Sequence, residues 1–181
     1  MGSWSQDVGR QGGHGAEDRR EQEDATLGAA GVPNNNSATI DGQPRTIVTY
    51  TDSKQVTTRP DGVTDSCWVD VKSAGREGAE RAVVYDTAQL RAQREGAGAG
   101  WPDGRERGRA VILTSGDREE NRPSRDLAKG SIVLHRATGG EGDEWSRWDP
   151  RLKDRQGDWR PIPAEDARAA LHADRTREKE R

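Results

Sequence analysis

Residues 67–72 read Cys-Trp-Val-Asp-Val-Lys, and the prediction of the fold starts from this stretch. Its β-branched and aromatic residues favour a β-strand. Side chains alternate between the two faces of a strand, so Asp70 and Lys72 share one face, while Val69 and Val71 point the other way. The strand therefore places a carboxylate and an ammonium group side by side.

A second carboxylate, Asp61, precedes this strand within Pro60-Asp61-Gly62. Pro-Asp-Gly is typical of a turn, and a hairpin here would carry Asp61 back beside Asp70. Carboxylate oxygens suit a hard divalent cation such as Mg²⁺ or Mn²⁺. A neighbouring lysine, here Lys72, can orient the attacking water or help to deprotonate it. The pattern therefore favours metal-assisted hydrolysis of phosphodiester bonds.

The segments around residues 67–72 predict an α/β domain with a mixed β-sheet flanked by helices. A helix is expected over residues 87–95, where Asp86 can act as the N-cap and Gln89 can complete a capping box. The apolar run at 110–114 then indicates a crossover to another strand. Further strands are expected at 45–50, 55–58, 82–85, 131–135, 144–148 and 159–162, and a second helix at 164–173.

The first 36 residues are Gly-rich and charged, with few apolar side chains. Such a segment cannot bury enough surface to offset its conformational entropy, so residues 1–36 are predicted to be a flexible, disordered leader. A short helix near 17–25 is compatible with the sequence but has no apolar stripe to dock it. The folded domain would then span residues 37–174, followed by a charged tail at 175–181.

The composition narrows the possible functions. Of 181 residues only 29% are hydrophobic and none is Phe, which indicates one domain with a small core. The net charge of −3 does not by itself indicate nucleic-acid binding. The single Cys67 excludes an internal disulfide and is expected to be a small buried apolar residue. Without a signal peptide or a long apolar run, the chain is expected to be soluble, with no membrane contact. It would lie in the cytoplasm of a producing or target cell and be exported, if at all, by a dedicated secretion system.

Three motifs carry a resemblance to a known superfamily: Arg59-Pro60-Asp61, Val69-Asp70-Val71-Lys72, and Gln89-Leu90-Arg91-Ala92-Gln93. Together they resemble the PD-(D/E)xK, or restriction-endonuclease-like, nucleases. They are similar in particular to bacterial restriction-endonuclease-fold toxin domains. The resemblance covers residues 46–115.

The resemblance implies a restriction-endonuclease-like sheet and an Mg²⁺-dependent endonuclease. By resemblance, Asp61 and Asp70 are metal ligands, Lys72 serves the water, and Gln89 supports the site. The implied partners are nucleic acid, with DNA expected rather than RNA, and an immunity protein of an effector toxin. The superfamily usually adds an acidic residue from a helix before the first strand, which Glu17 or Glu21 would have to supply here.

Simpler interpretations stay open beside these. Asp61 can be an ordinary turn residue, Asp70 and Lys72 can form a surface ion pair, and the capping box alone can account for Gln89. The chain would then be a non-catalytic binding or interaction module, for example a degenerate nuclease fold.

Basic and aromatic residues give further candidates for contact with nucleic acid. Phosphate contacts are expected from five arginines that flank the 110–114 strand: Arg105, Arg107, Arg109, Arg122 and Arg125. Interleaved acidic residues are equally consistent with a solvated loop. Trp145, Trp148 and Trp159 could stack on bases, but tryptophans of a hairpin more often pack against each other. His135 near a strand end could shuttle protons or be structural.

Overall fold

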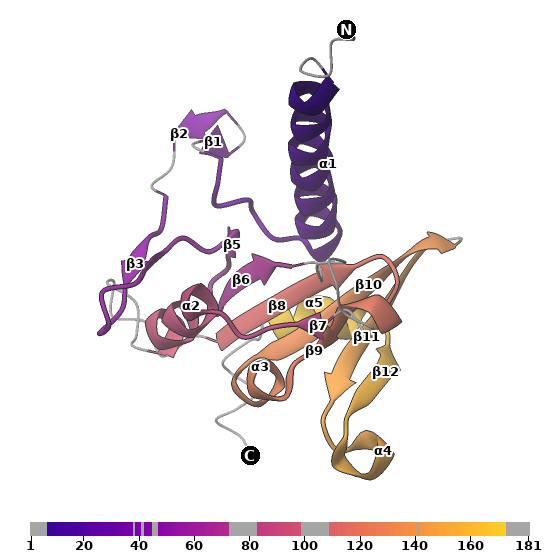
Figure 1. Ribbon diagram of the computed structural model, residues 1–181. Coiled ribbons are helices and arrows are strands. Elements are labelled where there is room, and N and C mark those ends of the chain that lie inside the picture. The colour runs from indigo at the N-terminus through magenta and orange to yellow at the C-terminus, as the bar shows by residue number, and fades with distance from the viewer. Residues whose placement is uncertain are drawn as a thin grey trace, which may run out of the picture.

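The computed structural model describes residues 7–37, 39–40, 42–44, 47–72, 83–98, 109–140 and 142–172. Its centre is one mixed sheet, in which three parallel strands are flanked by antiparallel ones (Figure 1). This confirms the predicted α/β class. In spatial order the strands are β12 (Asp158–Ile162), β11 (Gly142–Asp149), β10 (Ile132–Gly140), β8 (Arg109–Ser115), β6 (Cys67–Val71) and β5 (Gly62–Val63).

The parallel strands β6, β8 and β10 are joined by helical crossovers on one face of the sheet. The first crossover contains α2 (Ala88–Gly98) and the second contains α3 (Arg125–Gly130). Leu90 of α2 and Leu127 of α3 are buried in one cluster with Ile112 of β8. Because β8 is covered on both faces, its sequence is a continuous apolar run and not an alternating one.

The opposite face is covered by α5 (Ala164–Leu171) and by the end of α1 (Asp7–Ala30). Leu171 of α5 and Leu27 of α1 bury against Val69 of β6. Cys67 is fully buried in the same cluster, as predicted.

The structure differs from the predicted flexible leader over residues 7–36. The chain is helical in α1, and Leu27, Ala30 and Val32 are buried in the core at the end of this helix. These apolar residues lie in one short stretch. The average composition of residues 1–36 therefore does not reveal them. Their burial attaches α1 to the sheet, and α1 rises away from it in Figure 1. Residues 1–6 and the predicted tail at 175–181 lie outside the described residues.

The remaining elements are short. Where strands were predicted at 45–50 and 55–58, the structure describes the two-residue strands β3 (Tyr50–Thr51) and β4 (Thr57–Thr58), and residues 45–46 lie outside the described part of the chain. Between these strands, the side chain of Asp52 accepts hydrogen bonds from the backbone N–H groups of Lys54 and Val56 and forms a turn. These elements are β1 (Thr39–Ile40), β2 (Gln43–Pro44), β3 (Tyr50–Thr51), β4 (Thr57–Thr58), β7 (Val83–Val84), β9 (Arg122–Pro123), the 3-10 helix η1 (Glu119–Asn121) and α4 (Leu152–Arg155). Among the described helices, none has the length and apolar character needed to cross a membrane.

The predicted hairpin of tryptophans is confirmed in β11 and β12. Trp148 lies opposite Trp159 in the antiparallel ladder, and the two rings pack edge to face with centroids 5.2 Å apart. Nε1 of Trp159 donates a hydrogen bond to the backbone oxygen of Arg118. Trp145 is buried on the other face of the sheet. The structure therefore uses all three rings for packing.

Candidate active site

A short hairpin places Asp61 next to Asp70, as predicted. β5 and β6 pair antiparallel with Gly62 opposite Val69, so Asp61 faces the end of β6. Oδ2 of Asp61 accepts a hydrogen bond of 2.8 Å from the backbone N–H of Val71. This bond holds the Asp61 carboxylate beside the strand that carries Asp70.

Asp70 is buried and held from two sides. Its Oδ1 accepts a hydrogen bond of 3.0 Å from Nε2 of Gln93, and its Oδ2 lies 2.8 Å from Nζ of Lys72. Among the described residues, the Lys72 ammonium is therefore the close polar contact of Oδ2. Gln93 also donates to Oγ1 of Thr58, which ties α2 to β4. The Asp70 carboxylate is therefore fixed before anything binds.

Glu23 of α1 also lies near the Asp61 carboxylate. Nδ2 of Asn36 donates hydrogen bonds to Oε1 of Glu23 at 2.9 Å and to Oδ1 of Asp61 at 3.2 Å. Asn36 therefore bridges the two carboxylates. Glu23 is thus the residue of α1 that approaches the hairpin, whereas Glu21 is exposed and does not line the cavity described below. The side chain of Glu17 lies outside the described part of the chain.

The crowding of carboxylates changes their acidity. Burial, and then the negative charge of Asp70, raises the pKa of Asp61 to about 7, although the Val71 hydrogen bond opposes the rise. Burial lowers the pKa of Lys72, but the charges of Asp70 and Asp61 more than offset this and hold that pKa above its ordinary value. At neutral pH Lys72 therefore stays an ammonium group, which can donate hydrogen bonds.

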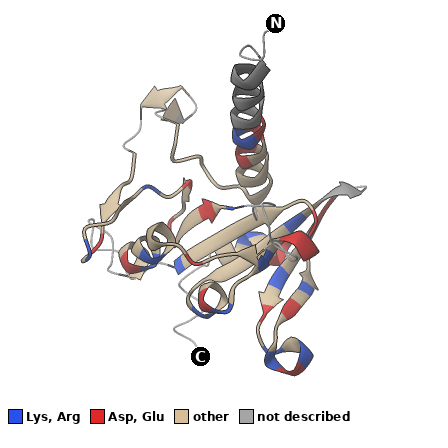
Figure 2. Ribbon diagram, viewed as in Figure 1, with Lys and Arg blue, Asp and Glu red and all other residues tan. Residues whose placement is uncertain are grey.

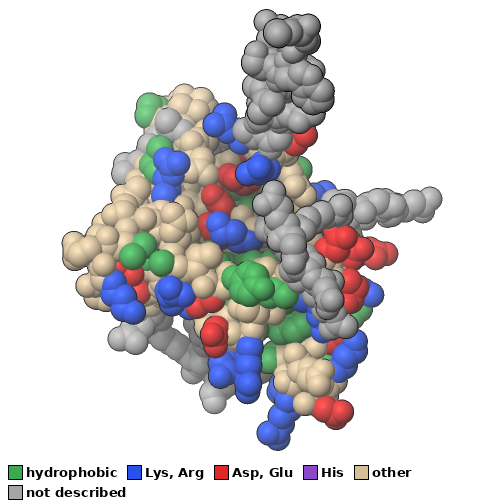
Figure 3. Space-filling model, in the orientation of Figure 1, with side chains coloured by type: hydrophobic (Ala, Val, Ile, Leu, Met, Phe, Trp, Pro, Cys, Tyr) green, Lys and Arg blue, Asp and Glu red, His purple; other side chains and the backbone are tan. Residues whose placement is uncertain are grey.

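These side chains line a cavity of about 1310 Å³. Figure 2 marks acidic residues on α1 and at the end of β6, and Figure 3 shows acidic and basic side chains close together below α1. The side chains near the carboxylates are mainly polar. Those that could contact a bound molecule include Arg20, Glu23, Arg59, Asp61, Asp70, Lys72, Gln89 and Gln93.

The donor set suits a hard cation with few protein ligands. Asp61 and Asp70 offer carboxylate oxygens at the cavity, and the described polar contact of the buried Oδ2 of Asp70 is the Lys72 ammonium. Across the same residues, no group of three or more His, Cys, Asp or Glu side chains is arranged to hold an ion by itself. Mg²⁺ commonly binds through one or two carboxylates and retains several waters, so two aspartates fit it.

The capping box predicted for Asp86 and Gln89 does not form. Thr87 caps α2 instead, because its Oγ1 accepts a hydrogen bond from the backbone N–H of Leu90. Asp86 accepts two hydrogen bonds from Arg94, at 2.6 and 2.7 Å. Gln89 is exposed and lines the cavity, but Gln93, one helical turn later, is the residue that contacts Asp70.

Of the five predicted phosphate-binding arginines, the three that the structure describes, Arg109, Arg122 and Arg125, do not line this cavity. Arg105 and Arg107 lie outside the described residues, and Arg109 begins β8 opposite Cys67, at the far end of the strand pair from Lys72. Arg122 contacts Glu119 at 2.9 Å and Asp158 at 3.6 Å, and its guanidinium lies over the Trp148 ring. Arg125 is exposed on α3 and does not line the cavity.

His135 is a structural residue of β10. Its Nδ1 lies 2.7 Å from Oγ1 of Thr114, and its Nε2 lies 3.0 Å from the backbone oxygen of Gly116. Burial lowers the pKa of this imidazole, so it is neutral at neutral pH. The ring therefore anchors the end of β8 and does not reach the carboxylates.

Comparison of the chain with protein-family models, with curated proteins and with solved structures found no match.

Sequence reasoning missed three residues of this site: Glu23, Asn36 and Gln93. Gln93 carried a signal, because it stands four residues after Gln89 and residues at this spacing share a helix face. Glu23 could have been predicted as a site residue if Leu27, one helical turn later, had been recognised as the residue that packs α1 against the sheet. Asn36 gave no local signal, since its role depends on how α1 and β5 meet.

Proposed function

We propose that this protein is a metal-dependent nuclease of the restriction-endonuclease-like kind. The observation that carries the proposal is the meeting of Asp61, Asp70 and Lys72 at one cavity, with Asp61 fixed by the Val71 N–H and Asp70 fixed by Gln93. Two preorganised carboxylates beside a charged lysine have the composition that phosphodiester hydrolysis requires.

Asp61 and Asp70 would hold the cation, Mg²⁺ or Mn²⁺. When bound, such an ion supplies Lewis-acid activation of water and stabilises the charge that builds on the phosphate. Glu23 would act through Asn36 by orienting the Asp61 carboxylate. The raised pKa of Asp61 is consistent with two carboxylates that lack a sufficient counter-charge.

Lys72 would orient the attacking water and stabilise the phosphate oxygens as a charged donor. Its pKa above the ordinary value makes it a poor proton acceptor while it is paired with Asp70. Gln93 takes the supporting role that the sequence suggested for Gln89, because it already donates to Asp70. Gln89, exposed in the cavity, is left to contact substrate.

DNA as the substrate, the role of an effector toxin and an immunity partner rest on the motif resemblance alone. The same holds for export by a secretion system. The cleavage assay below distinguishes DNA from RNA as the substrate.

The alternative is a non-catalytic binding module, and one observation favours it. Lys72 already neutralises Asp70 at 2.8 Å, and Gln93 satisfies the other oxygen, so this pair is self-contained without an ion. A degenerate site would retain such a pair for stability.

The deciding experiment is incubation of the purified protein with plasmid DNA and with structured RNA, in Mg²⁺ or in EDTA. We expect cleavage that needs Mg²⁺ and falls at least about a hundred-fold in Lys72→Ala. Lys72→Arg keeps the positive charge beside Asp70 and controls for folding, and Lys54→Ala removes an exposed lysine of the β3–β4 turn. Cleavage that survives EDTA or both Lys72 variants would reject the proposal.

A further inference from the structure

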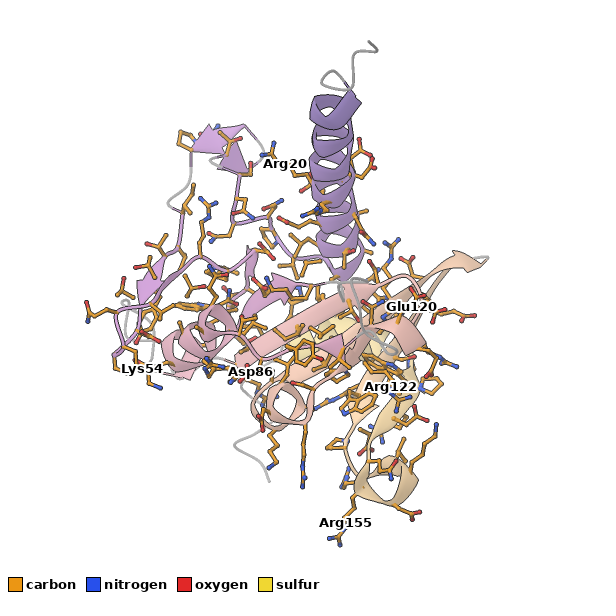
Figure 4. The ribbon with its side chains drawn as sticks, in the orientation of Figure 1. Arg20, Lys54, Asp86, Glu120, Arg122 and Arg155 are labelled. Carbon is orange, nitrogen blue, oxygen red and sulfur yellow. The ribbon has the colours of Figure 1, made fainter. Side chains whose placement is uncertain are left out.

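The charged cavity also contains two arginines that its carboxylates do not use. Arg20 comes from α1, and Arg59 from the segment between β4 and β5 that leads into Asp61. Both are exposed. Figure 4 shows Arg20 on the side of α1 that faces the β1–β2 hairpin. The two guanidinium groups therefore reach the cavity from separate elements.

Neither arginine forms an ion pair with any side chain that the structure describes. Arg94, Arg122 and Arg136, by contrast, each contact a carboxylate within 3 Å. A guanidinium without a carboxylate partner has its fork of donors free for an incoming anion. The pairing pattern therefore separates arginines that stabilise the fold from arginines available to a ligand.

The charge balance of the cavity explains why such cations are needed. Its lining holds four acidic side chains, Glu23, Asp24, Asp61 and Asp70, against three cationic ones, Arg20, Arg59 and Lys72. Lys72 is committed to Asp70. An anionic polymer that approaches these carboxylates would be repelled unless Arg20 and Arg59 bind its phosphates.

The residues that line the cavity also indicate which parts of a nucleic acid they could contact. No Trp, Tyr or His is among the described residues that line the cavity, so bases have no ring on which to stack there. Its neutral polar side chains are hydroxyls and amides, and Asn36 and Gln93 already donate hydrogen bonds to carboxylates. A nucleic acid bound in this cavity would therefore gain its affinity mainly from contacts to its backbone phosphates.

We propose that Arg20 and Arg59 are positioning residues that bind two backbone phosphates of a nucleic acid whose cleaved bond lies at Asp61 and Asp70, largely independent of base sequence. This inference rests on the proposed nuclease function. It replaces the arginines around β8 as the expected phosphate contacts. It also gives α1, which the sequence suggested was a leader, a place in the substrate site.

The test measures binding of short DNA duplexes in EDTA over a range of salt concentrations. Each phosphate contact contributes a slope of about −0.9 to the plot of log affinity against log salt for a duplex. We expect the double variant Arg20→Gln/Arg59→Gln to lower that slope by about 1.8 in magnitude, by equal amounts for two duplexes of unrelated sequence. The matched control Arg155→Gln/Arg168→Gln removes two exposed arginines of α4 and α5 and should leave the slope unchanged.

An unchanged slope in the cavity variant, or an equal fall in the control, would overturn the inference. A loss confined to one of the two sequences would also overturn it, because the arginines would then read bases. Cleavage by the wild-type protein in Mg²⁺ separates the two proposals. If cleavage occurs and the slope does not change, only this inference fails. If the slope falls as expected but no cleavage occurs, the cavity binds nucleic acid and the nuclease proposal fails.

Discussion

Two regions of the molecule both contain clustered charges but arrange them in opposite ways. Around the β11–β12 hairpin, opposite charges pair: Arg122 of β9 and Lys153 of α4 both contact Asp158 of β12, and the Trp148 and Trp159 rings pack beside them. At the β5–β6 hairpin, like charges meet, and Asp61 is forced toward Asp70. The first arrangement neutralises its charges, whereas the second leaves two carboxylates that share one lysine, so the pKa of Asp61 is raised by burial and by the charge of Asp70. A cluster whose charges do not fully neutralise one another is therefore the better candidate for a functional site.

The largest effect is expected in the tryptophan hairpin. Trp159→Ala should lower the free energy of unfolding by about 3–5 kcal/mol, because it removes a buried ring and its packing on Trp148. Urea denaturation measures the change, and Trp159→Phe should lose a smaller part of it. Nuclease activity of the fraction that remains folded should match the wild type. A change below about 1 kcal/mol would show that the rings contribute little to stability.

A smaller effect is expected where α1 meets the carboxylates. Glu23→Gln should reduce cleavage at limiting Mg²⁺ on the order of ten-fold, since residues that orient a metal ligand typically contribute this much. Excess Mg²⁺ should restore most of the rate. Glu21→Gln, a matched change on the same helix, should behave like the wild type. Equal losses in both variants would point to the charge of α1 in general, and would contradict a specific role for Glu23.

Removing one of the like charges should stabilise the protein. In the absence of divalent cations, Asp61→Asn keeps an acceptor for the Val71 N–H and ends the repulsion from Asp70. We expect a gain of about 1 kcal/mol in the free energy of unfolding near neutral pH, together with loss of cleavage. A destabilised Asp61→Asn protein would mean that the Asp61 carboxylate is satisfied by its surroundings.

The smallest effect concerns pH and the buried imidazole of His135. Burial holds its pKa below the ordinary value, so the unfolded chain binds a proton at a pH where the folded protein does not. The stability it contributes is therefore present above the unfolded pKa of about 6.5 and is lost as the pH falls through the folded pKa. Urea midpoints measured between neutral and mildly acidic pH should show this fall, and His135→Gln should flatten it in that range. An unchanged pH profile in His135→Gln would assign the acid sensitivity to other groups.

Local patterns in the sequence were sufficient for the sheet centre and for the carboxylate pair. Residues 67–72 alternate between faces as expected, and the turn at Gly62 returns Asp61 to the strand that contains Asp70. Both features depend on neighbours within one hairpin, which sequence periodicity reports directly. The continuous apolar run at 110–114 likewise predicts a buried strand, which β8 confirms.

The parts that escaped prediction depend on contacts between distant segments. α1 folds against the sheet through Leu27 and Ala30, and its Glu23 meets Asp61 only by way of Asn36. Asp86 is a second example of a contact that escaped prediction. It forms a bidentate ion pair with Arg94 and does not cap the helix, because two charge-assisted hydrogen bonds are stronger than one capping hydrogen bond. Neither arrangement produces a periodic pattern of residues from which it could be predicted.

Gly62 lies where the predicted hairpin and the unpredicted helix α1 meet. A Cβ atom at this position would lie 3.0 Å from Cδ2 of Leu27 and would overlap Cγ1 of Val32, so the absence of a side chain lets the end of α1 close over β5. The neighbouring Asp61 therefore owes its position to a steric fit made by three residues from two distant segments. Among homologous sequences, substitutions at Leu27, Val32 and Gly62 should therefore occur together and seldom singly. Such covariation would identify the interface between the helix and the hairpin.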